Sequence, residues 1–473
     1  MNPEKNVIPE KVKTIHLTAI CGTGMGALAG MLKEAGFQIT GSDANVYPPM
    51  STFLESKGIP VIQGFSPDNL AHNPDLVVIG NAVSRDNPEA VAVMEKGLHY
   101  CSFPQALDRF FASQKTPILV TGTHGKTTTS SLIAWLIAAV GLDPTFMIGG
   151  ILANFQSNHQ VGSGPYMVIE GDEYDTAFFD KGPKFLHYTP SRTVLTSIEF
   201  DHADIFRDLD HVKSAFTSLV ENLPKESLLV YHDADENIPD ILPQAKCWKT
   251  PYGFGEKTPW RLGEVKVEPP HTHFEVFRRG EFYAKFKVPL MGRHNAFNCL
   301  AAIAVADDLR IPPEGIAAGL ETFKGIARRQ QVRGVKNDIT IMDDFAHHPT
   351  AVRETLRAVK PFYQKGRVVA VFEPRTNSSR RNIFQEIYPT VFDEADIICI
   401  PQPPLLEKIP VEQRFSSEKL VADLKARGKE AHFFPTTQEI IDFLTKTLEP
   451  GDLAIIMSNG GFDNIHQRLL DAL

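Results

Sequence analysis

Short apolar runs alternate along the chain with stretches in which apolar residues recur every three to four positions. The first cycle is a strand over residues 15–20, a glycine turn, a helix that ends near Gly36, and a second strand over residues 37–40. A further continuous apolar run, residues 75–80, is typical of a parallel strand that is covered on both faces. The alternation predicts an α/β fold built on parallel sheets.

The same alternation restarts twice, which predicts three domains. A polar stretch at residues 114–117 precedes a new strand over residues 118–121, and a third unit begins near Arg328. The length of 473 residues agrees, because a domain averages about 150 residues. The expected domains are three α/β units over residues 1–113, 114–325 and 326–473.

Two regions need separate interpretation. Alternating apolar and polar positions at residues 272–277 and 282–288 indicate an antiparallel insertion or edge in the central domain. The most apolar stretch, residues 132–152, is interrupted by Asp143 and Pro144 and falls short of the ~20 apolar residues that a membrane span needs. It predicts a helix, a turn and a strand.

In the third unit, strands are expected at residues 339–342, 367–372, 397–400 and 453–457.

Charge and cysteine content narrow the function classes. Lys and Arg number 48 against 57 Asp and Glu, for a net charge of −9, which argues against a nucleic-acid partner. The five cysteines are far apart and form no CxxC pair, so we expect free thiols in a reducing compartment. The charged N-terminus lacks the apolar core of a signal peptide. We therefore expect a cytoplasmic protein without a membrane partner.

The first glycine turn predicts a diphosphate-binding site. Gly22, Gly24 and Gly26 follow a strand and open a helix, and Asp43 comes about 20 residues later at the end of the next strand. This is the dinucleotide-binding arrangement, in which backbone and helix N-terminus approach a diphosphate. Glycines that only make a tight turn remain an alternative.

The second glycine loop is a stronger signal. It reads Gly122-Thr123-His124-Gly125-Lys126-Thr127-Thr128 and lies between an apolar strand and an apolar helix. Backbone N–H groups of such a loop cradle ATP phosphates, while Lys126 would reach the β and γ oxygens and Thr127 would hold Mg²⁺. A chance Gly-Lys-Thr on a surface turn is the less favoured interpretation in this context.

Acidic groups follow two central strands. Residues 170–175 contain four carboxylates, and residues 199–204 contain three together with His202. Carboxylates this crowded repel one another unless a cation lies nearby, and oxygen ligands suit Mg²⁺. Solvated acidic loops are the alternative.

Further polar residues lie at helix starts and strand ends. Asn295 and Asn298 are in the first turns of a helix, where amides either read adenine or cap the helix. Arg329 offers a guanidinium to phosphate. Residues 343–349 and 372–377 end two strands of the third unit, the edge at which ligands bind in open α/β sheets.

Taken in order, these motifs resemble the Mur ligase superfamily over nearly the whole chain. Within it, the glycine turn with Gly41-Ser42-Asp43 is similar to that of the UDP-N-acetylmuramate ligases. Residues 173–181, 372–377 and 458–462 resemble the members that add a tripeptide. The members that add L-alanine typically have Ser where this chain has Tyr174.

The resemblance implies a Rossmann-like N-terminal UDP-sugar-binding domain, a central ATP-binding α/β domain of the P-loop ATPase type and a Rossmann-like C-terminal domain. It also implies an ATP- and Mg²⁺-dependent ligase for peptidoglycan recycling. ATP would phosphorylate the carboxylate of UDP-N-acetylmuramate, and the amine of L-alanyl-γ-D-glutamyl-meso-diaminopimelate (the murein tripeptide) would attack the acyl phosphate. L-Alanine is the alternative acceptor. An oxidoreductase that uses the first glycine turn for NAD is an alternative of another class, but it leaves the Lys126 loop unexplained.

The resemblance also implies roles for individual residues. The catalytic residues would be Lys126, Glu173, His202 and His347. The ATP site would comprise Gly122, Thr123, His124, Gly125, Lys126, Thr127, Thr128, Asn295, Asn298, Arg329 and Asp344. The UDP-sugar site would comprise Gly22, Gly24, Gly26, Ser42, Asp43, Asn81, Ser84 and His348. Arg375 and Asn377 would bind the peptide, and Thr127, Glu173 and His202 would serve Mg²⁺.

One position departs from several relatives. Some Mur ligases carry a carbamylated lysine about 15 residues after the metal-binding histidine, where this chain has Thr217. Lys213 is out of register with that position. We therefore expect no carbamate.

Overall fold

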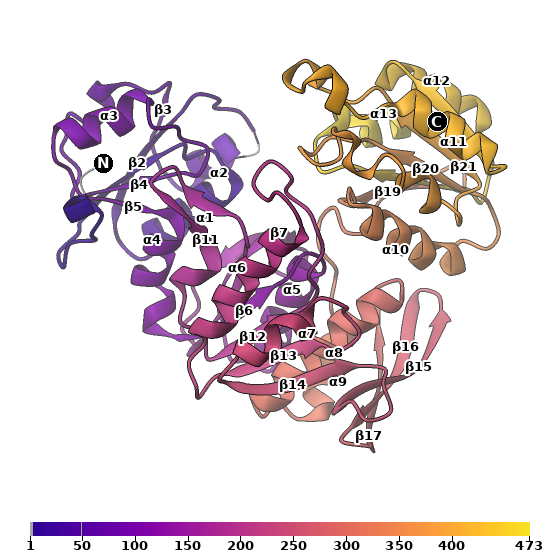
Figure 1. The fold of residues 1–473 in the computed structure, drawn as a ribbon, viewed down its shortest axis with the longest axis horizontal. Coiled ribbons are helices and arrows are strands. Elements are labelled where there is room, and N and C mark those ends of the chain that lie inside the picture. The colour runs from indigo at the N-terminus through magenta and orange to yellow at the C-terminus, as the bar shows by residue number, and fades with distance from the viewer. Residues whose placement is uncertain (1–2, 49) are drawn as a thin grey trace.

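Within residues 3–48 and 50–473, which the computed structural model describes, the strands form three large sheets and one two-stranded hairpin. The large sheets follow one another along the chain and occupy separate regions of the molecule (Figure 1). The hairpin pairs β10 (Asp175–Ala177) with β11 (Asp180–Pro183). The fold is therefore α/β with three domains, as the alternation predicts.

The N-terminal sheet is entirely parallel, with the strand order β3-β2-β1-β4-β5. Its strands are β1 (Thr14–Thr18), β2 (Gln38–Asp43), β3 (Val61–Gln63), β4 (Leu76–Ile79) and β5 (Tyr100–Ser102). Its helices are α1 (Thr23–Glu34), α2 (Met50–Ser56), α3 (Pro88–Glu95) and α4 (Phe103–Phe110). The order reverses between β1 and β4, and ligands bind outside the strand ends at such a switch point.

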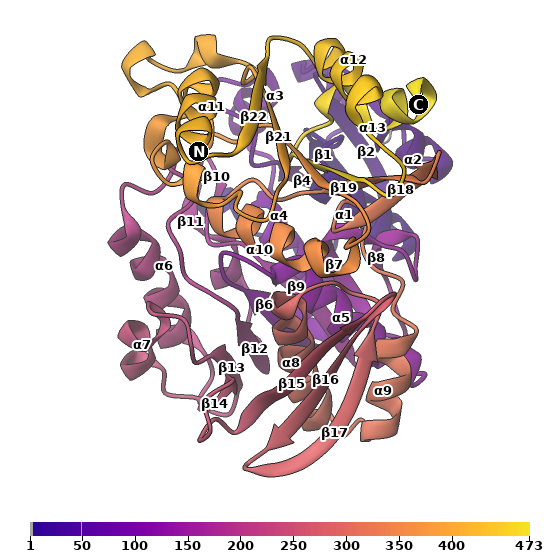
Figure 2. The ribbon, with the colours of Figure 1, turned by 90° about the vertical axis from the view of Figure 1, so that its right-hand side faces the viewer.

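The central sheet has ten strands in the order β17-β16-β15-β14-β13-β12-β6-β9-β7-β8. They are β6 (Thr116–Thr121), β7 (Thr145–Leu152), β8 (Ser157–Gln160), β9 (Tyr166–Gly171), β12 (Arg192–Leu195), β13 (Leu228–His232), β14 (Trp248–Gly253), β15 (Trp260–Glu268), β16 (His271–Arg278) and β17 (Glu281–Val288). The helices are α5 (Lys126–Ala139), α6 (Leu209–Asn222), α7 (Ile238–Ile241), α8 (Arg293–Asp308) and α9 (Pro313–Glu321). The strands β15, β16 and β17 pair antiparallel, which confirms the predicted antiparallel edge (Figure 2).

The C-terminal sheet has the order β18-β19-β23-β20-β21-β22, so the last strand of the chain lies inside it. Its strands are β18 (Gln331–Lys336), β19 (Ile339–Asp344), β20 (Val368–Phe372), β21 (Ile397–Pro401), β22 (Glu430–Phe434) and β23 (Leu453–Met457). Its helices are α10 (Pro349–Val359), α11 (Ser417–Ala426), α12 (Thr437–Thr447) and α13 (Ile465–Ala472). Only β18 runs antiparallel to its neighbour among these described strands. Separate apolar clusters fill the two faces, as a doubly wound sheet requires.

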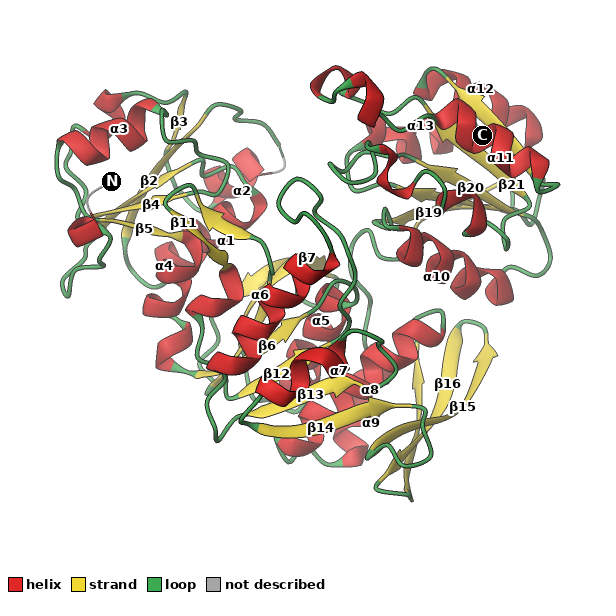
Figure 3. Ribbon diagram, in the orientation of Figure 1, coloured by secondary structure: helices red, strands yellow, loops and turns green. Residues whose placement is uncertain are grey.

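Several other expectations can be compared with the structure. The apolar stretch at residues 132–152 folds as α5, a turn and β7, and no helix among the described residues is long and apolar enough to cross a membrane. All five cysteines are free thiols, and four of them are buried. The hairpin β10–β11 and strand β22 were not predicted; all three strands are labelled in Figure 2, and Figure 3 distinguishes strands from helices by colour.

Candidate active site

The second glycine loop connects β6 to α5 at the carboxyl edge of the central sheet. Gly122 has φ +126°, and a Cβ atom there would lie 2.2 Å from the Thr196 hydroxyl and 2.8 Å from the Ser197 backbone. Gly125 has φ +79° and is backed by the Asn298 side chain. Only glycine tolerates the positive φ and the close contacts at these two positions. The loop backbone can therefore lie against the end of β12, and the N–H groups in the first turn of α5 have no partner within the helix.

Lys126 stands at the start of α5 and is almost enclosed. Its Nζ donates to the Gly122 carbonyl at 2.6 Å and lies 3.1 Å from Glu173 Oε2. Burial alone would lower the pKa of Lys126, but the carboxylates of Glu173, Asp172 and Glu170 raise it above its ordinary value. Lys126 is therefore a fixed cation at the mouth of a helix.

The acidic residues at the end of β9 surround this cation but differ in their partners. Glu173 is buried, and its Oε1 lies 3.5 Å from His202 Nε2. Glu170 accepts from Thr127 Oγ1 at 2.9 Å, and burial raises its pKa. Asp172 pairs with Lys184 at 2.9 Å; burial opposes ionisation, but the Lys184 and Lys126 charges hold its pKa at about 2.

The donor set is suitable for Mg²⁺. The hydroxyl of Thr127 and the carboxylates of Glu170 and Glu173 bring hard oxygen ligands to one cluster beside Lys126, and His202 adjoins it. Mg²⁺ binds through one or two carboxylates and substrate phosphates, which this cluster can accommodate. Glu170 was part of the predicted acidic segment but was not selected as an individual site residue.

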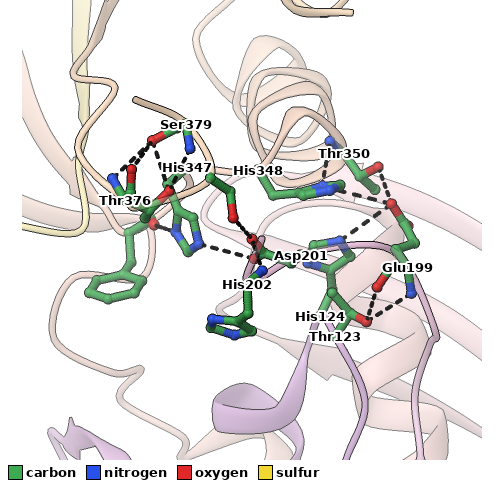
Figure 4. Close-up of polar contacts among 12 residues, drawn as sticks. Thr123, His124, Glu199, Asp201, His202, His347, His348, Thr350, Thr376 and Ser379 are labelled. Atoms are coloured by element: carbon green, nitrogen blue, oxygen red, sulfur yellow. Dashed lines mark hydrogen bonds and ion pairs between the residues drawn. The ribbon is translucent and has the colours of Figure 1, made fainter. Parts of the chain in front are cut away.

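The segment after β12 connects the central and C-terminal domains (Figure 4). Thr350 Oγ1 donates to Glu199 at 2.7 Å, and Ser378 Oγ donates to Asp201 at 2.8 Å. His347 Nε2 lies 3.6 Å from Asp201 Oδ2. Burial would raise the pKa of Asp201, but the imidazoles of His347, His202 and His348 hold it well below its usual range. Asp201 is thus a buried anion among three histidines.

His124 and His348 both lie beside Glu199. The ring centroids are 4.7 Å apart, and Glu199 Oε2 lies 3.5 Å from His124 and 3.7 Å from His348. His348 also donates from Nε2 to the Phe200 carbonyl at 3.2 Å. Neither Glu199 nor Asp201 was among the predicted site residues. Their position at the end of the strand beside the phosphate loop is the signal that identifies them.

The side-chain amides of Asn295 and Asn298, on α8, pack behind the phosphate loop. Asn298 is buried and accepts from Thr129 Oγ1 at 3.2 Å, and its Nδ2 donates to Asn295 Oδ1. Asn295 donates to the Met291 carbonyl and to Gln330. Of the two alternatives, adenine reading or support of the helix start, the contacts among described residues are those of support.

Arg329 and Asp344 meet at the start of the C-terminal domain. The Arg329 guanidinium is stacked over the Phe345 ring at 4.5 Å from its centroid and lies 3.4 Å from Thr127 Oγ1. Asp344 accepts from the backbone N–H groups of Gln330 and Ala346, each at 2.8 Å. A cavity of about 480 Å³ adjoins Arg329. Its lining includes Ile151, Met291, Lys324, Arg329, Gln330 and Val332.

The first glycine turn opens α1 at the switch point of the N-terminal sheet. Gly22 caps the helix, and the Cys21 N–H donates to Asp43 Oδ2 at 2.9 Å, so Asp43 reaches the turn as expected. A Cβ at Gly26 would overlap Met50, and one at Gly24 would only touch Phe103. Gly26 is therefore required for packing against Met50, whereas a side chain at Gly24 would meet only ordinary contacts.

The other predicted UDP-sugar residues fall into two groups. Asn81 and Ser84 are exposed after β4, and Ser84 Oγ donates to Asp86 at 2.5 Å. Ser42 is fully buried, and its hydroxyl donates to Glu89 at 2.6 Å. A ligand contact through the Ser42 hydroxyl would have to displace this hydrogen bond to Glu89, and the predicted contact stays a prediction.

The predicted peptide residues both have partners within the chain. Arg375 lies 3.2 Å from Glu373 Oε1, and this ion pair is a structural alternative to peptide binding. Asn377 Nδ2 donates to Asp204 at 2.8 Å, which connects it to the segment after β12.

The carbamate position lies away from this cluster, on α6. Thr217 Oγ1 donates to the Lys213 carbonyl at 2.9 Å, and the Lys213 ammonium pairs with Asp240 at 2.7 Å. The nearby lysine is therefore held in a surface ion pair.

A phosphate loop at the edge of the central sheet, flanked by two further parallel-sheet domains, defines a three-domain α/β protein of the P-loop type. Three family models match the chain. They are "Mur ligase family, catalytic domain" over residues 14–115, "Mur ligase middle domain" over residues 120–306, and "Mur ligase, glutamate ligase domain" over residues 328–460. The chain belongs to the Mur ligase family, whose members are ATP-dependent amide ligases.

Individual relatives extend over nearly the whole length. The chain is 40% identical to UDP-N-acetylmuramate–L-alanyl-γ-D-glutamyl-meso-2,6-diaminoheptandioate ligase of Escherichia coli, over 97% of this chain and 98% of the relative. A murein peptide ligase from Psychrobacter arcticus superposes with a TM-score of 0.72 at 34% identity, covering 97% and 98%. UDP-N-acetylmuramate-alanine ligase from Thermotoga maritima superposes with a TM-score of 0.79 at 25% identity, covering 98% and 99%.

These similarities distinguish between the two enzyme classes, ligase and oxidoreductase, that the sequence analysis considered. They support a ligase and give no support to the NAD-dependent oxidoreductase, since the relatives that match along the whole chain are named as ligases. The loop around Lys126, which the oxidoreductase alternative left unexplained, belongs to the matched middle domain.

Proposed function

We propose that the protein joins L-alanyl-γ-D-glutamyl-meso-diaminopimelate to UDP-N-acetylmuramate, with ATP and Mg²⁺, in peptidoglycan recycling. The observation that carries the proposal is the cluster of Lys126, Glu173 and His202 at the phosphate loop, in a chain 40% identical to the E. coli tripeptide ligase. The domains are assigned to residues 1–113, 114–325 and 326–473. We also propose a cytoplasmic location, which the five free cysteine thiols support.

The phosphate loop supplies charge where two anions must meet. Lys126, held charged by its acidic neighbours, contacts the transferring phosphoryl group, while the loop N–H groups hold the other phosphates. Mg²⁺ bound by Thr127, Glu173 and His202 would neutralise phosphate oxygens. Arg329 lies beside Thr127 and is positioned to extend this positive surface toward the nucleotide.

The N-terminal domain holds the sugar nucleotide. The turn at Gly22, Gly24 and Gly26 presents a helix N-terminus to the diphosphate, and Asn81 and Ser84 are exposed at the adjacent strand end. Asp43 orders the turn through the Cys21 N–H.

The C-terminal domain orients the acceptor. His347 is anchored by Asp201, and Asn377 by Asp204, so both reach the central strand edge from the opposite domain. Arg375 binds a peptide carboxylate by exchanging its present partner Glu373. Positioning of the amine against the activated carboxyl is then the main contribution of this domain.

L-Alanine is the second candidate acceptor, which the similarity to the T. maritima enzyme favours. The two are separated by measuring phosphate release with ATP, Mg²⁺ and UDP-N-acetylmuramate, adding either L-alanine or the tripeptide. The proposal requires faster release with the tripeptide at equal concentration. Faster release with L-alanine would overturn the acceptor assignment and keep the ligase assignment.

A further inference from the structure

Three side chains meet at the domain junction, and two of them, His124 and His348, were predicted from sequence for the ATP and UDP-sugar sites without a defined chemical role. His124 comes from the phosphate loop, Glu199 from the segment after β12, and His348 from the start of α10 (Figure 4). One ligand atom from each lies within 4.8 Å of the others. Two imidazoles and a carboxylate are the donors that Zn²⁺ takes in three-ligand sites.

The spacing is close to that of a metal site. Tetrahedral coordination with bonds of about 2.0–2.1 Å places neighbouring ligand atoms roughly 3.3–3.5 Å apart. The observed separations from Glu199 Oε2 are 3.5 Å to His124 Nε2 and 3.7 Å to His348 Nδ1. Only small adjustments would therefore bring all three atoms around one ion.

Supporting hydrogen bonds orient two of the three ligands. His348 donates from Nε2 to the Phe200 carbonyl at 3.2 Å, which fixes the tautomer; its Nδ1 lies 3.7 Å from Glu199 Oε2 and accepts the Thr350 N–H at 3.2 Å. Thr350 Oγ1 donates to Glu199 Oε2 at 2.7 Å. Metal-binding histidines and carboxylates are commonly held in this way by outer partners.

The third ligand has an unused nitrogen. His124 Nε2 is buried and makes no hydrogen bond to the described residues; its contact is with Glu199 Oε2 at 3.5 Å, while its backbone N–H donates to Ser197 Oγ at 3.0 Å. A contact of 3.5 Å is longer than an ordinary hydrogen bond, and an ion between the two atoms would satisfy both of them.

The charge states of His348 and Glu199 are suitable for binding a cation. Burial and the neighbouring His124 lower the pKa of His348 to about 4, so its imidazole is neutral near pH 7. Burial would raise the pKa of Glu199, but the imidazoles of His124 and His348 and the Thr350 hydroxyl lower it to about 2. The site thus offers a carboxylate and neutral nitrogen.

We propose that His124, Glu199 and His348 bind a divalent cation of the Zn²⁺, Co²⁺ or Ni²⁺ type, separate from the oxygen-rich Mg²⁺ position beside Lys126. The ion would connect the phosphate loop of the central domain to the first turn of α10 in the C-terminal domain. It would replace the 3.2 Å hydrogen bond from the Thr350 N–H to His348 Nδ1. Imidazole donors favour these metals over Mg²⁺.

The test uses the full-length protein, freed of metal by EDTA and dialysed with Zn²⁺ in an excess of Mg²⁺. We expect one bound Zn²⁺, and visible absorption bands of four- or five-coordinate Co²⁺ when Co²⁺ replaces it. His124→Gln and Glu199→Gln should each raise the Kd for Zn²⁺ at least ~100-fold. His432→Gln is the matched control, because His432 also lies beside a carboxylate, Glu430 at 3.3 Å, and should not change the Kd.

Two further variants keep the result interpretable. His348→Asn retains a side-chain acceptor for the helix cap and should lose Zn²⁺ binding without a change in unfolding temperature in the metal-free state. Glu173→Gln alters the Mg²⁺ position and should leave the Zn²⁺ affinity unchanged. No bound Zn²⁺ in the wild type, or loss of Zn²⁺ in Glu173→Gln with retention in His124→Gln, would overturn the proposal. None of these readouts depends on ligase activity.

Discussion

Replacing Lys126 by Met separates the structural and chemical roles of the phosphate-loop lysine. The side chains of Lys126 and Glu173 are 12% and 3% exposed, with 3.1 Å between Nζ and Oε2. At an effective dielectric constant of 20, unit charges at that separation attract by about 5 kcal/mol. Breaking a buried pair by removing one partner typically costs ~3–5 kcal/mol. Because His202 still lies 3.5 Å from Glu173, we expect a loss near 3 kcal/mol.

Tryptophan fluorescence during urea unfolding measures this loss in the relevant domain, because Trp135, Trp248 and Trp260 all lie in the central domain. Adding Glu173→Gln to Lys126→Met should restore stability to within ~1 kcal/mol, since the buried carboxylate without its partner is gone. Lys181→Met is the control. Lys181 makes a 3.0 Å pair with Asp175, but its side chain is 68% exposed, so the change should cost under ~1 kcal/mol.

The chemical role should not be restored with the stability. Both Lys126→Met and the double variant should lose roughly 10³ in ligation rate, the cost of one charged contact that strengthens in the transition state. A single variant that loses under ~1 kcal/mol, or a double variant no more stable than the single, would refute the electrostatic reasoning. Near-normal ligation by either would refute the phosphate-loop assignment.

Three other predictions concern separate parts of the molecule. His202→Gln should raise the Mg²⁺ concentration for half-maximal rate, and a loss of rate that does not respond to Mg²⁺ would indicate a structural role instead. Arg375→Lys should raise the tripeptide KM and leave the KM values for ATP and UDP-N-acetylmuramate nearly unchanged, because an ammonium cannot make two parallel bonds to a carboxylate; an unchanged tripeptide KM rules the role out. Glu89 is fully buried, and although burial would raise its pKa, hydrogen bonds from His16, Ser42 and Asn69 lower it. Its stability advantage over Glu89→Gln should be complete above pH ~4.5 and disappear as pH falls through the lowered folded-state pKa, whereas a pH-independent difference in urea midpoints would contradict this.

The parallel strands could be predicted because burial on both faces produces continuous apolar runs. The segments that became β4, β6, β20 and β23 are of this kind, and all four appear within a residue or two of their expected positions. Strand β22 pairs on one side only, at the sheet edge, and its residues 432–434 are half-buried, so no apolar run marks it. The hairpin β10–β11 is too short for any periodicity to show.

The site was predictable in part for a related reason. A loop such as residues 122–128 can be recognised from consecutive residues, because its glycines and lysine lie between a strand and a helix. Contacts between domains have no such local signal, so the pairing of Glu199 with Thr350, or of Asp201 with Ser378, required the structure. Ser42 shows that side-chain contacts within a domain are also hard to predict, because residue type alone did not indicate that its hydroxyl donates to Glu89.

The most direct measurement of the proposed ligation is the fate of the muramate carboxylate oxygens. UDP-N-acetylmuramate labelled with ¹⁸O in that carboxylate would be incubated with the enzyme, ATP, Mg²⁺ and the murein tripeptide, and the released phosphate analysed by mass spectrometry. An acyl-phosphate path transfers one ¹⁸O atom to each phosphate as the amide forms, and we predict that result, with little phosphate formed when L-alanine replaces the tripeptide. Tripeptide ligation that yields unlabelled phosphate would contradict the mechanism, and the absence of tripeptide-dependent phosphate release would contradict the proposed function.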